Sequence, residues 1–366
     1  GNREWHYSNA FLRPIVLAPH SEQTIYALVC TGTSKQVNEQ IEKFHSTPEA
    51  FISSIPKDSN NLGKRILSNG KKYEFGHRLL QSALLSNIVY PVHTQGQYIR
   101  HFTPGKNWNS LYTWDSGFIA LGLIDIDITK AFECIRAYTT PVGSESAFIH
   151  HGTPLPIQLY AYYDLWNNTQ SKEALQFLYP RLKQFFDFMV GKNPYSTTRM
   201  KGSGLLRTWD YFYNSGGWDD YPPQHALRDK ASVTPVVTSA YYIRAAKILR
   251  LAAKELGFKK DVKEYEHIIK QLSESLQAHS WDEETGYFGY VMHDNNGKPK
   301  GIYRYKDGSN FNKGLDGVSP LIANISSQEQ TDRMINHIFS PNEMWTDVGI
   351  STVDQSAPYY RTDGYW

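Results

Sequence analysis

The chain has 366 residues, of which 40% are hydrophobic and 20% charged, and its formal net charge is +2. This composition is typical of a globular protein with enough apolar residues to bury a large core. Basic and acidic residues nearly balance and no long basic run occurs, which argues against a nucleic-acid partner. No apolar run approaches the ~20 residues of a membrane helix, so no membrane partner is expected.

Aromatic residues are unusually frequent, at 14% of the chain with 25 Tyr and 9 Trp. Their rings stack on sugars or bases, so the excess favours a carbohydrate-type cleft over a purely aliphatic one. Cys30 and Cys134 are the only cysteines, too few for a disulfide framework and without metal-ligand spacing, and we expect buried free thiols. We predict no metal and no cofactor, and neither the oligomeric state nor the cellular compartment follows from the sequence.

The N-terminal part of the sequence predicts β structure followed by a linker. The runs 13–18 and 24–30 are rich in β-favouring residues and are separated by the turn composition of residues 19–22. Two strands need partners, so residues 1–33 are interpreted as the tail of a β-sandwich or as strands docked on a helical body. Residues 34–64 are interpreted as a linker that contains one helix over about 34–51.

Helical periodicity dominates the rest of the chain. Apolar residues recur at helical spacing over 73–89, over 171–191 and over 234–257, and again over 262–276. Ser171 is the expected N-cap of the second helix and Pro180 its expected kink, and Gly257 is expected to end the third. The last two helices are joined by a few residues and should lie antiparallel.

The order of the elements predicts an all-α fold built from helix pairs. The helical segments alternate with long loops rich in Gly, Trp and Asp, without βαβ alternation and without a glycine-rich phosphate fingerprint. If such pairs close into a toroid, the loops at one end surround a central cleft, where a ligand site is expected.

The segment 214–223, Asn-Ser-Gly-Gly-Trp-Asp-Asp-Tyr-Pro-Pro, has the composition of a site loop. Gly216 and Gly217 permit unusual backbone dihedrals, and the two prolines stiffen the exit, which holds Asp219 and Asp220 in place. An indole beside a carboxyl raises its pKa towards that of a general acid. The alternative is a surface turn with solvated acids.

Three other loops carry Trp-Asp pairs. Trp114 and Asp115 precede the apolar run 119–124, where Asp115 could equally be a helix N-cap. Arg207 and Trp209 lie in the segment 206–211 that leads into the 214–223 loop. Residues 281–288 are better interpreted as a structural turn into a hairpin, which returns through the turn at 294–297 rather than through a calcium loop.

Four motifs of this sequence, in their order along the chain, resemble glycoside hydrolase families 37 and 63, which include trehalases, processing α-glucosidases and the mannosylglycerate-hydrolase-like branch. The resemblance covers residues 65–366. The motifs that carry it are Trp114-Asp115-Ser116, Gly217-Trp218-Asp219, Trp281-Asp282-Glu283 and the terminal Asp363-Gly364-Tyr365-Trp366.

The resemblance implies an (α/α)6 toroid, often preceded by a β-sandwich, that hydrolyses α-glycosidic bonds with inversion. The general acid of the family falls on Asp219, and an extra glycine before Trp218 leaves Asp220 as a possible substitute. The resemblance further implies that the substrate is an oligosaccharide or glycoside and that Trp114, Asp115 and Trp218 line the −1 subsite. The other expected substrate contacts are Arg207 and Trp209, which match no family motif, and Trp366.

Inverting hydrolysis also needs a base carboxylate roughly 6.5–9.5 Å from the acid. In the resembled families this base is a glutamate after the Gly-Tyr-Trp motif, where the given sequence ends. The expectation is therefore an open barrel lacking its last one or two helix pairs, inactive unless complemented. Glu343, Asp316 and Asp115 are the internal candidates.

Two other classes remain as alternatives. One is an α-L-rhamnosidase or glucoamylase-like enzyme, which shares the architecture but places its acids differently. The other is a non-catalytic carbohydrate-binding toroid whose aromatic residues still bind glycans.

Overall fold

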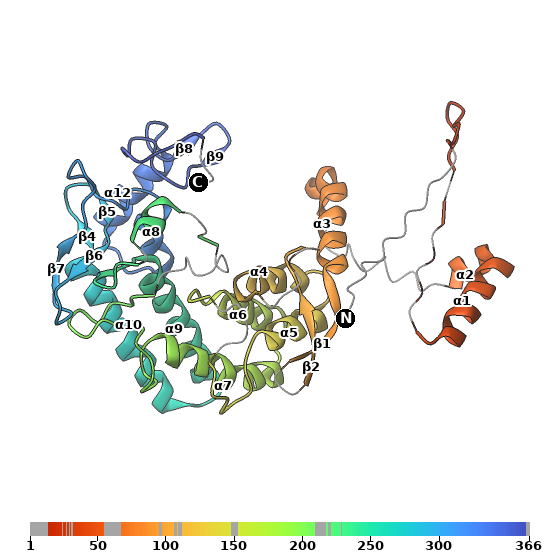
Figure 1. Ribbon diagram of the computed structural model, residues 1–366, viewed down its shortest axis with the longest axis horizontal. Helices are drawn as coiled ribbons and strands as arrows, with labels where there is room; N and C mark the ends of the chain where they lie inside the picture. The colour runs from red at the N-terminus through yellow and green to blue at the C-terminus, as the bar shows by residue number, and fades with distance from the viewer. Residues whose placement is uncertain are drawn as a thin grey trace, which may run out of the picture. The chain divides into compact units, whose positions relative to one another are not determined.

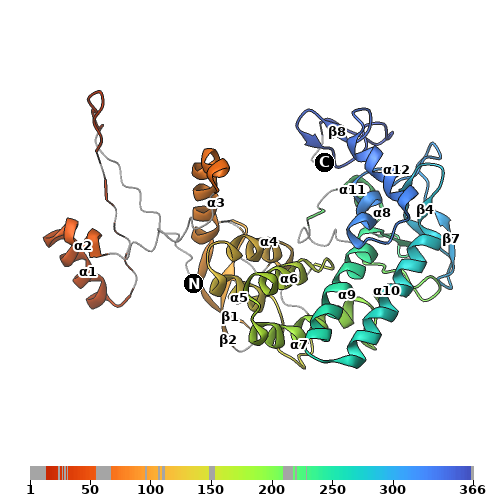
Figure 2. The same cartoon turned by 180° about the vertical axis from the view of Figure 1, so that it is seen from behind.

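The computed structural model describes residues 14–23, 25, 26, 28, 30, 32–54, 67–94, 97–105, 108, 112–147, 153–208, 217, 218, 221–227 and 229–363. The chain divides into two compact units, Gly1–Lys64 and Arg65–Trp366, and each is described by itself. Figures 1 and 2 show both units from opposite sides.

The first unit contains the helices α1 (Ser34–Ser46) and α2 (Pro48–Ser54), which confirm the helix predicted over 34–51. Thr33 begins α1 with a capping box. The backbone N–H of Gln36 donates to the Thr33 hydroxyl, and the backbone N–H of Thr33 donates to the Gln36 side chain at 2.9 Å.

The predicted N-terminal strands are not found among the described residues of 14–30. The turn at 19–22 is confirmed, because the backbone N–H of Ser21 donates to the carbonyl of Ala18 at 3.1 Å. The described residues before this turn, 14–18, have no regular secondary structure and are exposed, with Val16 94% exposed. A β-favouring composition makes a strand only where a second strand offers hydrogen bonds, and none of the described residues pairs with this segment. The sandwich interpretation stays a prediction.

The second unit opens with a 3-10 turn, a helix and a hairpin. The helix predicted over 73–89 is confirmed, but it is shorter, because residues 88–94 and 97–102 form two antiparallel strands that pair Ile88 with Phe102. Because Ile88 continues the helical spacing of the preceding residues, the strand that begins there was not predicted. The register shifts between Val89 and Val92, around Pro91, which has no N–H to donate. The elements are η2 (Ser68–Tyr73), α3 (Glu74–Ser86), β1 (Ile88–Thr94) and β2 (Gln97–Phe102).

Among the described residues between 113 and 279, six helices of ten or more residues follow, and they are of two alternating kinds. The first, third and fifth are buried over much of their circumference, whereas the second, fourth and sixth bury one stripe and expose the opposite face. In chain order they are α4 (Thr113–Ile124), α5 (Ile128–Ala137), α6 (Ile157–Thr169), α7 (Lys172–Met189), α9 (Val237–Glu255) and α10 (Lys259–His279).

The burial pattern separates an inner row of helices from an outer one. In the inner row, α4 packs against α6, α6 against α9, and α9 against the short helix η3 (Ser319–Ala323). On the outside, α5 packs on α4, α7 on α6 and α9, and α10 on α9 (Figures 1 and 2). The predicted helix-pair architecture is confirmed. Ser171 caps α7 as predicted, and Pro180 lies inside that helix.

The C-terminal part of this unit alternates short strands with short helices. The predicted hairpin is confirmed, and its return turn is held by the Asp294 carboxylate, which accepts from the backbone N–H of Asn296 and Lys298, both at 2.9 Å. The elements are β3 (Val233–Thr234), β4 (Trp281–Asp282), β5 (Tyr287–Phe288), β6 (Val291–His293), β7 (Pro299–Ile302), α11 (Leu315–Val318), α12 (Gln328–Phe339), β8 (Trp345–Thr346) and β9 (Gly349–Ile350), with α8 (Pro222–Leu227) before β3.

Many of the aromatic residues are buried in the core. Several tyrosines are fully buried and place their hydroxyls on acceptors, as Tyr162 does on the carbonyl of Leu175 at 3.1 Å. Cys134 is a buried free thiol as predicted, whereas the free thiol of Cys30 is half-buried. Among the residues that the structure describes, no helix is long and apolar enough to cross a membrane.

Candidate active site at the N-terminal ends of the inner helices

The inner helices α4, α6 and α9 begin at the same end of the unit. Gly117, in the second turn of α4, lies so close to Ile157, the first residue of α6, that a Cβ on Gly117 would be 2.2 Å from Ile157 Cγ2. One turn into α6, the ring of Tyr160 lies 5.6 Å from that of Tyr241 in α9. The three helices therefore run in the same direction, and their free backbone N–H groups gather at one end.

Asp316 in α11 brings a fourth helix start to this end. Its carboxylate accepts from the backbone N–H of Val237, the first residue of α9, at 2.8 Å, and from the Tyr290 hydroxyl at 2.8 Å and the Gln224 amide at 3.3 Å. Burial raises the pKa of Asp316 to about 6, although these hydrogen bonds act in the opposite direction. These three donor residues lie 26, 79 and 92 residues away from Asp316 in the sequence, so no local motif predicts this role.

The 214–223 loop reaches this end at Gly217 and Trp218. A Cβ on Gly217 would lie 1.9 Å from Cζ2 of Trp114, so the Gly217 backbone rests directly against the indole. Trp218 is 7% exposed, and its ring lies 4.9 Å from that of Tyr221 in an edge-to-face arrangement. The backbone N–H of Tyr221 donates to the carbonyl of Trp218 at 3.1 Å. The glycine at 217 is thus needed for close approach, a reason that the sequence did not reveal.

Trp114 and Asp115 lie in the first turn of α4. The N-cap of this helix is Tyr112, which forms no side-chain capping bond, so the alternative of Asp115 as N-cap is wrong. A carboxylate in the first turn still interacts favourably with the helix dipole. The Trp114 ring also meets Phe118, one turn later, at 5.1 Å. The indole is therefore fixed between its own helix and the Gly217 backbone.

Arg207 is held at the same end by the start of α9. Its backbone N–H donates to the carbonyl of Thr198 at 2.8 Å, and the neighbouring Thr208 carbonyl accepts from the Thr238 hydroxyl at 2.6 Å. The backbone N–H of Leu206 donates to the Ser239 hydroxyl at 3.1 Å. These bonds fix the segment 206–208 against the first turn of α9, with the Arg207 side chain half-buried.

The structure thus brings the Trp114 indole against Gly217, which directly precedes the buried Trp218 in the chain, and places Arg207 on the α9 side of the same end. Asp115 follows Trp114 in the first turn of α4. The other predicted site residues lie outside the described residues. They are Trp209, Asp219, Asp220 and Trp366.

Tyr221 is a residue of this end that sequence reasoning missed. It is fully buried, and burial followed by the nearby Asp316 charge raises the pKa of its hydroxyl well above the ordinary value. Tyr221 therefore joins the Trp218 wall to Asp316. Its position directly after the Asp-Asp pair was the available signal, but a tyrosine in an aromatic-rich loop carries no specific motif.

Glu343, a second internal carboxylate named from the sequence, belongs to a different cluster. Its Oε1 lies 2.8 Å from Nδ1 of His337, whose Nε2 donates to the Thr285 carbonyl at 3.0 Å. The ligand atoms of His337, Glu343 and Asp354 all lie within 4.8 Å of one another, a spacing that a metal could use. Lys313 Nζ, 3.4 Å from the Asp354 carboxylate, already supplies positive charge there.

Trp281 and Asp282, the fourth Trp-Asp pair of the sequence, are structural as predicted. Arg304 binds the nearly buried Asp282 carboxylate with both terminal nitrogens, at 2.8 and 2.9 Å, and the Thr285 hydroxyl donates to it at 2.7 Å. These bonds lock the β4–β5 turn and leave the carboxylate no free face for a ligand.

Paired helices with aromatic and acidic loops at one end are the features of a six-hairpin glycosidase. The model of the mannosylglycerate hydrolase MGH1-like glycoside hydrolase domain matches residues 108–366. This match spans more than half of the chain, and the protein therefore belongs to this glycoside hydrolase family. No curated protein sequence matches the chain.

Solved structures show the same fold at low identity. The GH63 mannosylglycerate hydrolase from Thermus thermophilus in complex with Tris is 18% identical, with a TM-score of 0.54 over 79% of this chain and 82% of that chain. Its complex with glucose is 19% identical, with a TM-score of 0.53 over the same shares. A structure named Sialidase is 14% identical, with a TM-score of 0.55 over 82% of this chain and 25% of that chain.

Proposed function

We propose that this protein hydrolyses an α-glycosidic bond in an oligosaccharide or small glycoside with inversion of configuration, and that Asp219 is its general acid. The contact of the Gly217 backbone with the Trp114 indole carries the proposal. It fixes the chain two residues before Asp219, and the buried Trp218 side chain fixes the residue directly before it.

The apolar wall at this end suits a proton donor. Trp114, Trp218 and Tyr221 surround the entry and exit of the Asp219-Asp220 pair with aromatic surface. Such surroundings disfavour the ionised carboxylate, so the group stays protonated and can donate to the departing glycosidic oxygen. Asp220 is the substitute to be tested beside Asp219.

The same residues would bind the sugar. We propose that Trp114 and Trp218 present ring faces to the pyranose, and that Asp115 and Arg207 bind its hydroxyls, together with Trp209, Asp220 and Trp366. The relative from Thermus thermophilus is called a mannosylglycerate hydrolase and was solved with glucose. An α-mannoside or α-glucoside with a small aglycone is therefore the substrate class to test first.

Two of the three internal candidates for the base are engaged in the fold. Asp316 is fully buried and its oxygens accept from three donors, and Glu343 is bound to His337. A base must reach a water molecule, which a buried carboxylate with occupied lone pairs cannot do. Of these three, Asp115 is the carboxylate whose position in the first turn of α4 is compatible with the role.

The general acid and the general base can be told apart by how the rate of each variant depends on the leaving group of the substrate. Asp219→Asn should abolish turnover of mannosylglycerate and trehalose, whose leaving oxygens need a proton, but retain turnover of a dinitrophenyl α-glycoside, whose leaving group needs none. Asp115→Asn, if it removes the base, should slow both classes equally. Asp347→Asn, an exposed aspartate in the β8–β9 turn, is the matched control.

The stereochemical outcome is tested by proton NMR of the first product. Inversion of an α-glycoside releases the β-anomer, which then mutarotates. Release of the α-anomer would refute inversion. Unchanged turnover of unactivated substrates by the Asp219→Asn variant would remove Asp219 from the mechanism. Glycan binding without turnover by the unmodified protein would fit a carbohydrate-binding role and also the expected lack of the base.

A further inference from the structure

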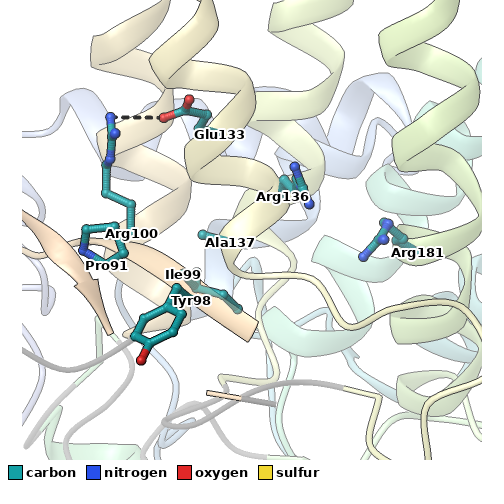
Figure 3. Close-up of a pocket in the computed structure, with 8 residues that line it drawn as sticks. All are labelled: Pro91, Tyr98, Ile99, Arg100, Glu133, Arg136, Ala137 and Arg181. Atoms are coloured by element: carbon teal, nitrogen blue, oxygen red, sulfur yellow. Dashed lines mark hydrogen bonds and ion pairs between the residues drawn. The ribbon is translucent and has the colours of Figure 1, made fainter. Parts of the chain in front are cut away.

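A second site is suggested by a cavity on the outer side of the helix pairs. The cavity has a volume of about 220 Å³ and lies between β2, α5 and α7. Figure 3 shows three arginines around it, each from a different element: Arg100 from β2, Arg136 from α5 and Arg181 from α7. Pro91, Ile99 and Ala137 provide its apolar lining.

The three guanidinium groups differ in how their charge is balanced. Arg100 turns towards Glu133 and forms an ion pair with it at 3.2 Å (Figure 3). Arg136 and Arg181 have no carboxylate partner among the residues that the structure describes. The cavity therefore carries two positive charges that the described part of the chain leaves uncompensated.

Both arginines lie close to the ring of one phenylalanine, Phe177. The guanidinium carbon of Arg136 lies 5.7 Å from the ring centre of Phe177, and that of Arg181 lies 4.7 Å from the same centre. Phe132, one turn before Arg136, packs on this ring at 5.6 Å. Each helix thus presents a Phe and an Arg four residues apart, and both guanidinium groups lie near the same ring and line the same cavity.

The closeness of the Arg136 and Arg181 charges is electrostatically unfavourable for the folded protein. Arg136 lies in the last turn of α5, where a positive charge is favoured by the helix dipole, but Arg181 lies in the middle of α7. Burial, followed by the Arg136 charge, lowers the pKa of Arg181. A guanidinium stays protonated at neutral pH, so the repulsion persists until an anion binds.

We propose that this cavity binds the phosphate group of a small molecule, with the phosphate oxygens between Arg136 and Arg181. A phosphate ester carries about −1.5 to −2 charges at neutral pH, which matches the two uncompensated guanidinium groups. A carboxylate carries one charge and pairs with one guanidinium, as Glu133 already does with Arg100.

The size of the cavity and its rim favour a small phosphorylated metabolite over a large ligand. Its volume is below the ~300–1,000 Å³ of pockets for drug-sized molecules. Tyr98, which is 76% exposed, stands at the rim and offers a ring on which a sugar could stack. The cavity shares no lining residue with the proposed catalytic site, and its proposal does not depend on the proposed hydrolysis.

The test is calorimetric titration and thermal shift of the full chain with glucose 6-phosphate, inorganic phosphate and glucose. We expect both phosphates to bind and glucose alone not to bind this cavity. Tighter binding of glucose 6-phosphate assigns a sugar phosphate as the ligand, and equal binding assigns free phosphate. Arg136→Gln and Arg181→Gln should each weaken phosphate binding about tenfold or more.

Arg78→Gln is the matched control, because Arg78 is a 68% exposed arginine of an i,i+4 pair in α3, and it should leave binding unchanged. Arg136 is exposed, so its variant keeps the test valid even if the half-buried Arg181 proves necessary for folding. Equal phosphate affinity in the unmodified protein and in the Arg136→Gln variant would overturn the proposal. Absence of any phosphate binding at millimolar concentration would overturn it as well.

Discussion

Replacing Gly217 by alanine tests the contact on which the proposed site depends. The added Cβ would lie 1.9 Å from Cζ2, 2.1 Å from Cε2 and 2.6 Å from Nε1 of Trp114, all atoms of one rigid ring. Carbon atoms in contact are separated by about 3.5 Å, so the loop or the indole must move by roughly 1.5 Å. Overpacking of this kind costs about 1–3 kcal/mol of unfolding free energy.

The functional effect should be larger than the effect on stability. A shift of about 1 Å in a reacting group can cost about a hundredfold in rate, and Asp219 follows Gly217 by two residues. We expect the Gly217→Ala variant to fold, with a changed near-ultraviolet circular dichroism spectrum from Trp114, and to lose about two orders of magnitude in kcat/KM on an α-glycoside. Urea unfolding measures the stability change.

Two further variants isolate the cause. Gly76→Ala in α3 is the control, because a Cβ there meets no atom within 4 Å, and it should gain up to about 1 kcal/mol from helix propensity. Trp114→Phe should relieve the clash, so that the double variant is more stable than the sum of the two single changes predicts. Unchanged stability and spectrum in Gly217→Ala, or strict additivity with Trp114→Phe, would refute the close approach of loop and indole.

Three other changes test the frame around the site. Asp316→Asn should flatten the pH dependence of stability. Since the native pKa of about 6 exceeds the ordinary 3.8, ionisation of Asp316 lowers the unfolding free energy by about 3 kcal/mol as pH rises from about 4 to 6. Urea unfolding of both proteins across that range should show this slope only in the unmodified protein. Gly117→Ala should destabilise by about 1–3 kcal/mol, offset in part by helix propensity, because its Cβ would lie 2.6 Å from the backbone carbon of Ile157; an increase in the unfolding midpoint would contradict the parallel packing of α4 and α6. Arg304→Gln should cost about 1–3 kcal/mol by leaving the nearly buried Asp282 carboxylate without its bidentate partner, and equal denaturation curves would show that the bond is dispensable.

The helices were predictable where a single sequence stretch carries its own signal. The periods of α3, α7, α9 and α10 are long, and Ser171 and Gly257 mark two of their ends. The shorter helix α12 was not predicted, although its start carries a capping box between Ser327 and Gln330. The strands at 13–30 were predicted from composition but were not found among the described residues, because strand formation depends on a partner.

The site was predictable in its composition but not in its geometry. The motifs predicted that Trp114 and Trp218 line one subsite, and in the structure the Trp114 indole lies against Gly217, the residue before Trp218. The role of Asp316 was not predictable, since Val237, Tyr290 and Gln224, which donate to its carboxylate, come from three distant segments. Long-range hydrogen bonds of this kind leave no periodicity or spacing in the sequence.

The end of the unit where the inner helices begin offers two different environments for carboxylates. A helix N-terminus favours a negatively charged side chain, and Asp115 lies in the first turn of α4. The aromatic rings of Trp114, Trp218 and Tyr221 form an apolar surface, which disfavours a charged group beside it. Inverting hydrolysis requires this difference, because one carboxyl must be protonated while the other is charged. If Asp219 lies against the wall, its pKa should fall when Trp218 is replaced by Ser. The alkaline limb of the pH profile of kcat, where a general acid loses its proton, should then move to lower pH. A profile that keeps its shape would place the proton donor elsewhere.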